Sequence, residues 1–368
     1  MTLVVLTMIL SLLGVLGAAE LFTNGVEWLG KRLNIARGAV GSVLAAVGTA
    51  LPETLVALVA VLVGTEGGKE IGIGAILGAP FMLSTLAFGV TGLAVVGYRK
   101  RRGRRRLVID RDVMVRDLGT FVVLYSLAVG SSFLPWREVR QLVVAILVMG
   151  YAGYLVKTFS GPGKIEGELN PLHLKVVFFR YFARRKKHEA HHEFHERRRR
   201  HQEHPPSLLP ILMQVAIALG IIVGGARLFV HGAEEVALAM GVSPMVFAMV
   251  VAPVMTELPE KFNSITWVRQ SKDTLAMGNI TGAMVFQSSI VPSVGIIFTQ
   301  WHLLSGHGHH QAALASVGVA LFSGLVVLAL VMRPTRSGSH RTSLHPGVLL
   351  GLSALYLVWL LFAFFIHL

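Results

Sequence analysis

The sequence predicts an all-α membrane protein with ten transmembrane helices arranged in two inverted five-helix repeats. Three observations support this fold class: long apolar segments, basic residues sorted between alternate loops, and an internal repeat with a shared motif. Hydrophobic residues make up 53% of the 368 positions and charged residues only 15%, which is unlike a soluble domain. The chain has no cysteine, which excludes disulfides, thiolate metal sites and cysteine catalysis.

Ten apolar segments of about 20 to 28 residues are each long enough to cross a hydrocarbon core of about 30 Å as a helix. Their continuous apolar character favours helices over barrel strands, in which apolar and polar residues alternate. The first segment is expected to remain as a helix, because it lacks the basic start and the cleavage site of a signal peptide. The segments are 3–28, 38–64, 71–97, 113–134, 139–159, 207–230, 244–268, 274–299, 312–332 and 346–367.

Lys and Arg residues concentrate in alternate loops. The basic loops are 29–37, 98–112, 160–206, 269–273 and 333–345. The positive-inside rule therefore predicts that both termini lie outside a prokaryotic plasma membrane, with the 160–206 loop in the cytoplasm. In this context the net charge of +14 indicates topology and contact with anionic lipid headgroups, and not nucleic acid binding.

The chain contains an internal repeat. Residues 17–53 align without a gap with residues 224–260, and about a third of the 37 aligned positions are identical, including a shared Thr-x-Leu-Pro-Glu. Five helices per half is an odd number, so the second half enters the membrane from the opposite side. The predicted organisation is a first repeat over 1–159, the basic loop over 160–206 and a second repeat over 207–368. Inverted repeats with interrupted helices are typical of secondary transporters that bind their substrate near the bilayer midplane.

The shared motif places a proline inside the second and seventh predicted helices. Pro52 and Pro259 lack a donor N–H, so we expect each helix to be broken there and to release carbonyl groups. Each proline is followed by a glutamate, Glu53 or Glu260, and is preceded at three residues by a threonine, which is Thr49 or Thr256. Carboxylate, hydroxyl and carbonyl oxygens are the ligands expected for Ca²⁺ or Na⁺. A carboxylic acid inside a membrane costs free energy to bury and therefore indicates function. The simpler alternative is that these acids are structural and are hydrogen-bonded to neighbouring helices.

Glu257 is not mirrored in the first half, where Ala50 is aligned with it. Lys261 stands four residues later, at the spacing of a helical ion pair, so a private Glu257–Lys261 bridge is one interpretation. The other is that Glu257 supplies a third acid, as a proton carrier or as an additional cation ligand.

Two motifs of the chain resemble those of a known family. GTALPE (48–53) and MTELPE (255–260) are each followed by a glycine-rich helix, within motifs that cover 48–84 and 252–289. These motifs are similar to the two α-repeats of the Ca²⁺/cation antiporter superfamily, the sodium/calcium exchanger-like membrane proteins. The resemblance implies an alternating-access exchanger of Ca²⁺ against Na⁺ or H⁺, without a cofactor. Carried onto this chain, the divalent site would contain Glu53, Glu260, Thr49 and Thr256.

The flanking positions depart from the family pattern. Ala50 and Glu257 replace a common serine, and the later helices read Gly78-Ala79-Pro80 and Gly282-Ala283-Met284 where Gly-Ser-Asn is common. Gln287 stands where a polar or acidic side chain is usual, and Asn279 is a weaker candidate on the same helix. The missing hydroxyls would weaken sodium sites, so coupling to H⁺ is a serious alternative to coupling to Na⁺. A proton and a metal ion can compete for the same carboxylate.

Other functions remain open. The histidines of segment 184–204 either form surface metal sites or belong to a solvated basic helix near anionic lipid. A passive cation channel is a rival, although a repeat within one chain favours a monomeric carrier. A proton-coupled or non-calcium exchanger and a transport-inactive metal-sensing protein are further alternatives. No nucleophile, acid pair with room for a substrate, or nucleotide loop supports an enzyme.

Overall fold

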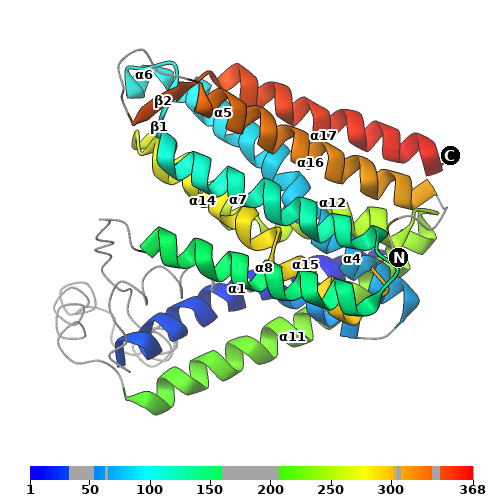
Figure 1. Cartoon of the computed structure of the whole chain (residues 1–368). Coiled ribbons are helices and arrows are strands. Elements are labelled where there is room, and N and C mark those ends of the chain that lie inside the picture. Colours follow the sequence, from blue (N-terminus) through cyan, green and yellow to red (C-terminus); the bar gives the residue numbers. More distant parts are fainter. Residues whose placement is uncertain are drawn as a thin grey trace.

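The computed structural model describes residues 1–32, 54–62, 65–159, 207–301, 303, 308–333 and 340–367. Helices make up nearly all of this part of the chain (Figure 1), which confirms the expected helical class. In chain order the elements are α1 (Thr2–Arg32), α4 (Glu66–Met82), η2 (Leu83–Ala87), α5 (Phe88–Gly97), α6 (Arg99–Arg102), β1 (Leu107–Asp110), α7 (Arg111–Gly130), η3 (Ser131–Phe133), α8 (Arg137–Phe159), α11 (Leu208–Ala239), α12 (Pro244–Thr256), α13 (Leu258–Arg269), α14 (Asp273–Gln287), α15 (Ile290–Phe298), α16 (Gly308–Met332), β2 (Arg341–Leu344) and α17 (Pro346–His367).

Eight helical segments within the described residues are long and apolar enough to cross a membrane. They are Thr2–Leu29, Glu66–Gly97, Arg111–Phe133, Arg137–Thr158, Leu208–Ala239, Asp273–Phe298, His310–Met332 and Pro346–Ala363. Most of the expected span 38–64 lies outside the described residues, although residues 54–62 are helical. The expected span 244–268 forms two shorter helices, α12 and α13, that meet at Glu257.

The span Glu66–Gly97 is interrupted near its middle. Thr65 caps its start, because its hydroxyl oxygen accepts a hydrogen bond from the Gly68 N–H at 2.9 Å. Pro80 lies inside α4, and the five-residue π-helical segment η2 follows three residues later. Proline has no N–H and crowds the preceding turn, and a wider π turn is one way in which a helix accommodates this.

Specific contacts join the chain at each of the two ends of the helical bundle. At one end, β1 pairs with β2 in antiparallel register, with Leu107 opposite Leu344. At the other end, the Trp301 indole donates a hydrogen bond to the Ala128 carbonyl at 3.0 Å. Figure 1 shows both chain termini at the end opposite β1 and β2.

Helices α1 and α11 lie side by side (Figure 1) and run antiparallel. Gly232, late in α11, faces Met8 near the start of α1. Gln214, early in α11, donates from Nε2 to the Leu21 carbonyl at 2.8 Å and to Asn24 Oδ1 at 3.0 Å. At 31 and 32 residues, both helices exceed the roughly 20 residues that a perpendicular span requires, so a membrane position needs tilt or extension beyond the hydrocarbon.

Helices α4 and α12 approach each other closely through the glycines of α4. A methyl group on Gly74 would overlap the Met245 carbonyl oxygen, and one on Gly78 would overlap the Met249 carbonyl oxygen. The four-residue spacing of these glycines therefore serves packing in α4, as small residues do in membrane helices. It also brings the backbone of α12 next to the interrupted span.

Apolar side chains cover the outer faces of the bundle. On α8, Leu142, Met149 and Val156 are 60%, 63% and 67% exposed. A soluble monomer rarely exposes such a continuous apolar face, whereas lipid tails solvate it well. The surface therefore agrees with an integral membrane protein.

Candidate functional site

The junction between α12 and α13 is a loosened turn. Glu257 lies between the two helices, and its N–H is 3.2 Å from the Pro253 carbonyl oxygen. The Lys261 N–H is 3.3 Å from the Glu257 carbonyl oxygen, which is longer than the usual 2.9–3.0 Å of a backbone hydrogen bond. Pro259 occupies the first turn of α13, where a missing N–H is tolerated. The helix break expected at Pro259 is present, and it falls two residues earlier, at Glu257.

Four polar side chains that the sequence predicted for the site are buried here. They are Thr256, Glu257, Glu260 and Gln287, each less than 5% exposed. The Thr256 hydroxyl donates to the Ala252 carbonyl at 3.0 Å, within α12. Asn279, on α14, donates from Nδ2 to the Glu260 carbonyl at 3.2 Å, which holds α14 against the start of α13.

A small cavity lies where the interrupted helices meet. Its volume of about 10 Å³ is close to the minimum for one water-sized occupant. Thr256 and Gln287 supply its polar side chains, so the structure brings these two predicted residues together. The full lining is Val56, Ala75, Ala79, Ala252, Pro253, Thr256, Gln287 and Val291.

Glu260 is buried in the first turn of α13 and does not line this cavity. Its Oε2 atom receives no hydrogen bond from any residue in the described ranges. A buried carboxylate oxygen without a donor is costly unless it is protonated or binds a cation. Glu260 therefore retains coordination capacity next to the helix break.

Glu257 and Lys261 form the ion pair that their spacing predicted. The distance from Lys261 Nζ to Glu257 Oε2 is 3.5 Å, and both side chains are buried. Lys261 Nζ is also 3.4 Å from the Pro253 carbonyl oxygen and 3.2 Å from Met82 Sδ. Neither carboxylate oxygen of Glu257 receives a hydrogen bond from the described part of the chain.

Two predicted ligands of the first half, Thr49 and Glu53, lie outside the described residues. The described helix resumes at Thr54, and Val56 lines the cavity. The chain that follows Glu53 therefore reaches the same cavity as Thr256 and Gln287. The histidine-rich segment 184–204 also lies outside the described residues.

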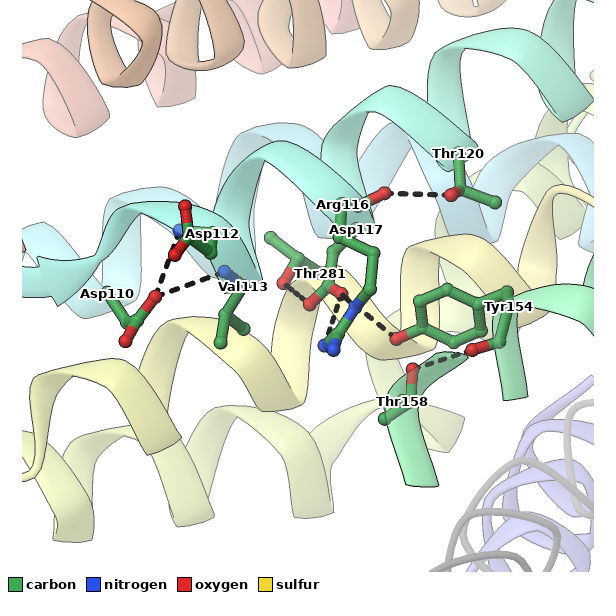
Figure 2. Close-up of polar contacts among 9 residues, drawn as sticks. All are labelled: Asp110, Asp112, Val113, Arg116, Asp117, Thr120, Tyr154, Thr158 and Thr281. Carbon is green, nitrogen blue, oxygen red and sulfur yellow. Dashed lines mark hydrogen bonds and ion pairs between the residues drawn. The ribbon is translucent and has the colours of Figure 1, made fainter. Parts of the chain in front are cut away.

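A further buried acid was missed by sequence reasoning. Asp117, on α7, is 1% exposed and accepts hydrogen bonds from three side chains that approach it from α7, α8 and α14 (Figure 2). Arg116 donates at 2.9 and 3.0 Å and Tyr154 at 3.1 Å to Oδ1, and Thr281 donates at 2.8 Å to Oδ2. An acid inside the apolar segment 113–134 was the signal that could have identified it. Because its oxygens are well supplied with donors, Asp117 acts as a tie between helices.

A second buried pair ties a basic loop to α14. Arg102 and Asp273 are both fully buried, and Arg102 Nη2 lies 2.6 Å from each oxygen of the Asp273 carboxylate. Asp273 also accepts the Val108 N–H at 2.8 Å. Part of the basic loop 98–112 is therefore structural as well as a determinant of topology.

Comparisons with known proteins agree with this geometry. The sequence matches the family described as "sodium/calcium exchanger protein" over residues 3–159 and 211–365. The putative antiporter CaxA of Alkalimonas amylolytica is 24% identical over 281 residues, which cover 76% of each chain. The crystal structure of the H⁺/Ca²⁺ exchanger CAX superposes with a TM-score of 0.67 at 17% identity, covering 99% of this chain and 84% of that one. The sodium-calcium exchanger NCX_Mj superposes with a TM-score of 0.52 at 20% identity, covering 97% of each chain.

These matches include both halves of the chain and both motif-bearing segments. The named relatives are antiporters and exchangers, in agreement with the expectation of a transporter and not an enzyme. With its apolar helices and apolar outer faces, this chain is an integral membrane protein that belongs to the sodium/calcium exchanger protein family.

Proposed function

We propose that this protein is a secondary active antiporter that exchanges Ca²⁺ for Na⁺ or H⁺ by alternating access. The cavity at the junction of the interrupted helices is the observation that carries the proposal, because it places Thr256 and Gln287 beside a helix break that also bears Glu260. Membership of the exchanger family supports the same function. The exchangers CAX and NCX_Mj, which share the fold, are named for H⁺/Ca²⁺ and sodium-calcium exchange.

The proposed cation site combines both halves of the chain at the bilayer midplane. Glu260, Thr256 and Gln287 come from the second half, and the sequence repeat assigns Thr49 and Glu53 to the first. Hard oxygen ligands of this kind suit Ca²⁺. Within the described residues no three His, Asp or Glu side chains lie close enough together to hold a metal ion. Because Glu257 is paired with Lys261, Glu260 supplies one carboxylate and Glu53 would have to supply the second.

The proposed architecture is ten membrane helices in two inverted repeats, over 1–159 and 207–368. The antiparallel contact of α1 with α11 supports it, because these are the first helices of the two halves and related helices run in opposite directions under an inverted repeat. The position of both termini at one end agrees with an even number of spans.

We further propose that the termini face outward from a prokaryotic plasma membrane and that the 160–206 loop is cytoplasmic. The exposed basic residues at the opposite end would then contact anionic headgroups. The transport unit is a monomer, because one chain supplies both repeats. The histidine-rich loop would serve topology in this arrangement.

Flux measurements test the function directly. Purified protein in liposomes loaded with Ca²⁺ is challenged with an imposed Na⁺ gradient or an imposed pH gradient. We expect one of the two gradients to drive Ca²⁺ movement, and Glu53→Gln or Glu260→Gln to abolish it. Glu138→Gln, at an exposed position at the start of α8, is the matched control.

Ca²⁺ movement that ignores both gradients would indicate a channel. Movement that survives both site substitutions would contradict the proposed site. Ca²⁺ binding without any flux would instead support the transport-inactive, metal-sensing alternative.

A further inference from the structure

The second half of the chain contains a charge pair that the first half lacks. Glu257 and Lys261 align with Ala50 and Thr54 under the repeat. The second half therefore carries one negative and one positive side chain in the same helical turn, beside the helix break, where the first half has neither. The two charges cancel, so the pair changes the chemistry beside the helix break without changing the net charge.

The surroundings of the Lys261 ammonium are those of a bound cation. Nζ lies 3.5 Å from a carboxylate oxygen of Glu257 and 3.4 Å from the backbone carbonyl oxygen of Pro253. Carboxylate and carbonyl oxygens at a broken helix are also the ligands that a mobile cation uses in transporters. A lysine ammonium is a compact point charge on a flexible stem, so it can take the place of a small monovalent ion.

The ammonium lies next to the cavity. Ala75 and Ala79 line the cavity from α4, and Met82, which contacts Nζ at 3.2 Å, continues the same helical face one turn further along. Pro253 lines the cavity and also accepts from Nζ through its carbonyl. The Lys261 ammonium therefore lies directly beside the candidate cation site.

The pair differs from Asp117, which is also a buried acid of the bundle. Asp117 receives hydrogen bonds from Arg116, Tyr154 and Thr281, whereas Glu257 has only the ion pair with Lys261 among the described residues. A buried carboxylate that serves only as a structural tie is normally supplied with several donors. Glu257 keeps unused coordination sites, as an ion ligand does.

We infer that Lys261 is a tethered cation, whose ammonium permanently occupies a monovalent cation position at Glu257. Glu257 then binds no transported ion. If Glu53, Glu257 and Glu260 each bound transported ions, every exchange cycle would carry one more monovalent cation than it does with Lys261 in place. The inference rests on the proposed antiport for its role in the cycle. Its binding consequence can be measured without transport.

Removal of the ammonium should open the position to a free ion. Equilibrium binding of radioactive Na⁺ to purified protein is measured at alkaline pH, so that protons compete weakly. We expect Lys261→Thr to bind one more Na⁺ per chain than the wild type. Glu257→Ala combined with Lys261→Thr, which restores the residue types of the first half, should remove the additional Na⁺.

Two controls separate this effect from changes in folding and in overall charge. Lys69→Thr removes a half-buried lysine that is paired with Glu66 at 2.6 Å, and it should add no bound Na⁺. Lys261→Arg keeps the positive charge and should also add none. If Lys261→Thr does not fold, Lys261→Met replaces it, because an unbranched apolar chain fills the same space beside Met82.

An unchanged Na⁺ count in the folded Lys261→Thr or Lys261→Met protein overturns the inference. An additional Na⁺ that persists in the double variant overturns it as well, since the ion would then not be bound at Glu257. In liposomes, Lys261→Thr should change the charge moved per Ca²⁺ by one relative to the wild type. Absence of Ca²⁺ flux in the wild type would contradict the proposed antiport, and the Na⁺ count would still decide the role of Lys261.

Discussion

The buried polar residues differ in how much of their role can be predicted from sequence. Thr256 and Gln287, which the repeat motif and the family pattern singled out, line the same cavity. Glu257 and Lys261 are paired, as their spacing predicted. Asp117 has no acid at the equivalent position of the repeat motif, so the mirrored Thr-x-Leu-Pro-Glu segments do not point to it. Arg116 is its neighbour in sequence, but Tyr154 and Thr281 come from α8 and α14, and pairing at such separations is not visible without a fold.

Removal of the Thr256 hydroxyl tests the proposed site at the scale of a single residue. Thr256→Val keeps the shape of the side chain and removes the only oxygen that it offers to the cavity. We expect the affinity for Ca²⁺ to fall roughly tenfold, equivalent to about 1.4 kcal/mol, because a cation would lose one oxygen contact. Calorimetric titration of purified protein measures the change.

Thr91→Val is the matched control for this substitution. Thr91 is also buried and also donates to the carbonyl four residues earlier, at 2.9 Å, but it lies in α5 away from the cavity. Equal losses of affinity in both variants would show that Thr256 acts only through helix stability.

Asp117 provides a residue-scale test of stability. Asp117→Ala leaves the donors of Arg116, Tyr154 and Thr281 without their acceptor, and we expect the free energy of unfolding to fall by about 3 kcal/mol. Thr281→Val removes a single bond and should cost about 1 kcal/mol. Denaturant unfolding in detergent micelles measures both. A loss below that of an exposed control, Asp112→Ala, would contradict the role of Asp117 as a tie between helices.

At the scale of elements, apolar segments predicted the spans well and their ends less well. The segment expected at 71–97 begins at Glu66, and the one expected at 207–230 continues to Ala239. Hydropathy marks where an apolar segment stops, but a helix continues past the hydrocarbon wherever its backbone hydrogen bonds are retained. The strands β1 and β2 were not expected, because two four-residue segments pair only once the fold brings their loops together.

The glycines of α4 and α14 give an element-scale prediction. Gly78→Ala should lower the free energy of unfolding by about 1–3 kcal/mol, because the added methyl group would overlap the Met249 backbone. Gly282→Ala should be neutral or should stabilise by up to about 1 kcal/mol, since its methyl group would lie 3.6 Å from the Tyr154 hydroxyl oxygen and alanine favours the helix. Denaturant unfolding of the two variants is the measurement. Similar losses for both would indicate that α4 and α12 do not pack through backbone contact.

At the scale of the whole molecule, the sequence predicted a helical membrane fold, and the match to the exchanger family agrees with it. The internal repeat was informative because its motif recurs at a fixed offset, a signal that depends on no single helix boundary. The packing of α1 on α11 could not be predicted in the same way. It depends on where glycines such as Gly225 and Gly232 meet a neighbour, and this follows from three-dimensional contact.

The orientation of the chain gives the last prediction, and the absence of cysteine makes it simple to test. Thr2→Cys and His367→Cys place single thiols at the two termini, and Ser160→Cys places one at the start of the basic loop. If basic loops face the cytoplasm, a membrane-impermeant maleimide should label both terminal thiols on intact cells and should leave Cys-substituted Ser160 unlabelled until the cells are opened. The wild type supplies the unlabelled control. Labelling of the loop thiol on intact cells would reverse the orientation, and labelling of only one terminus would contradict an even number of spans.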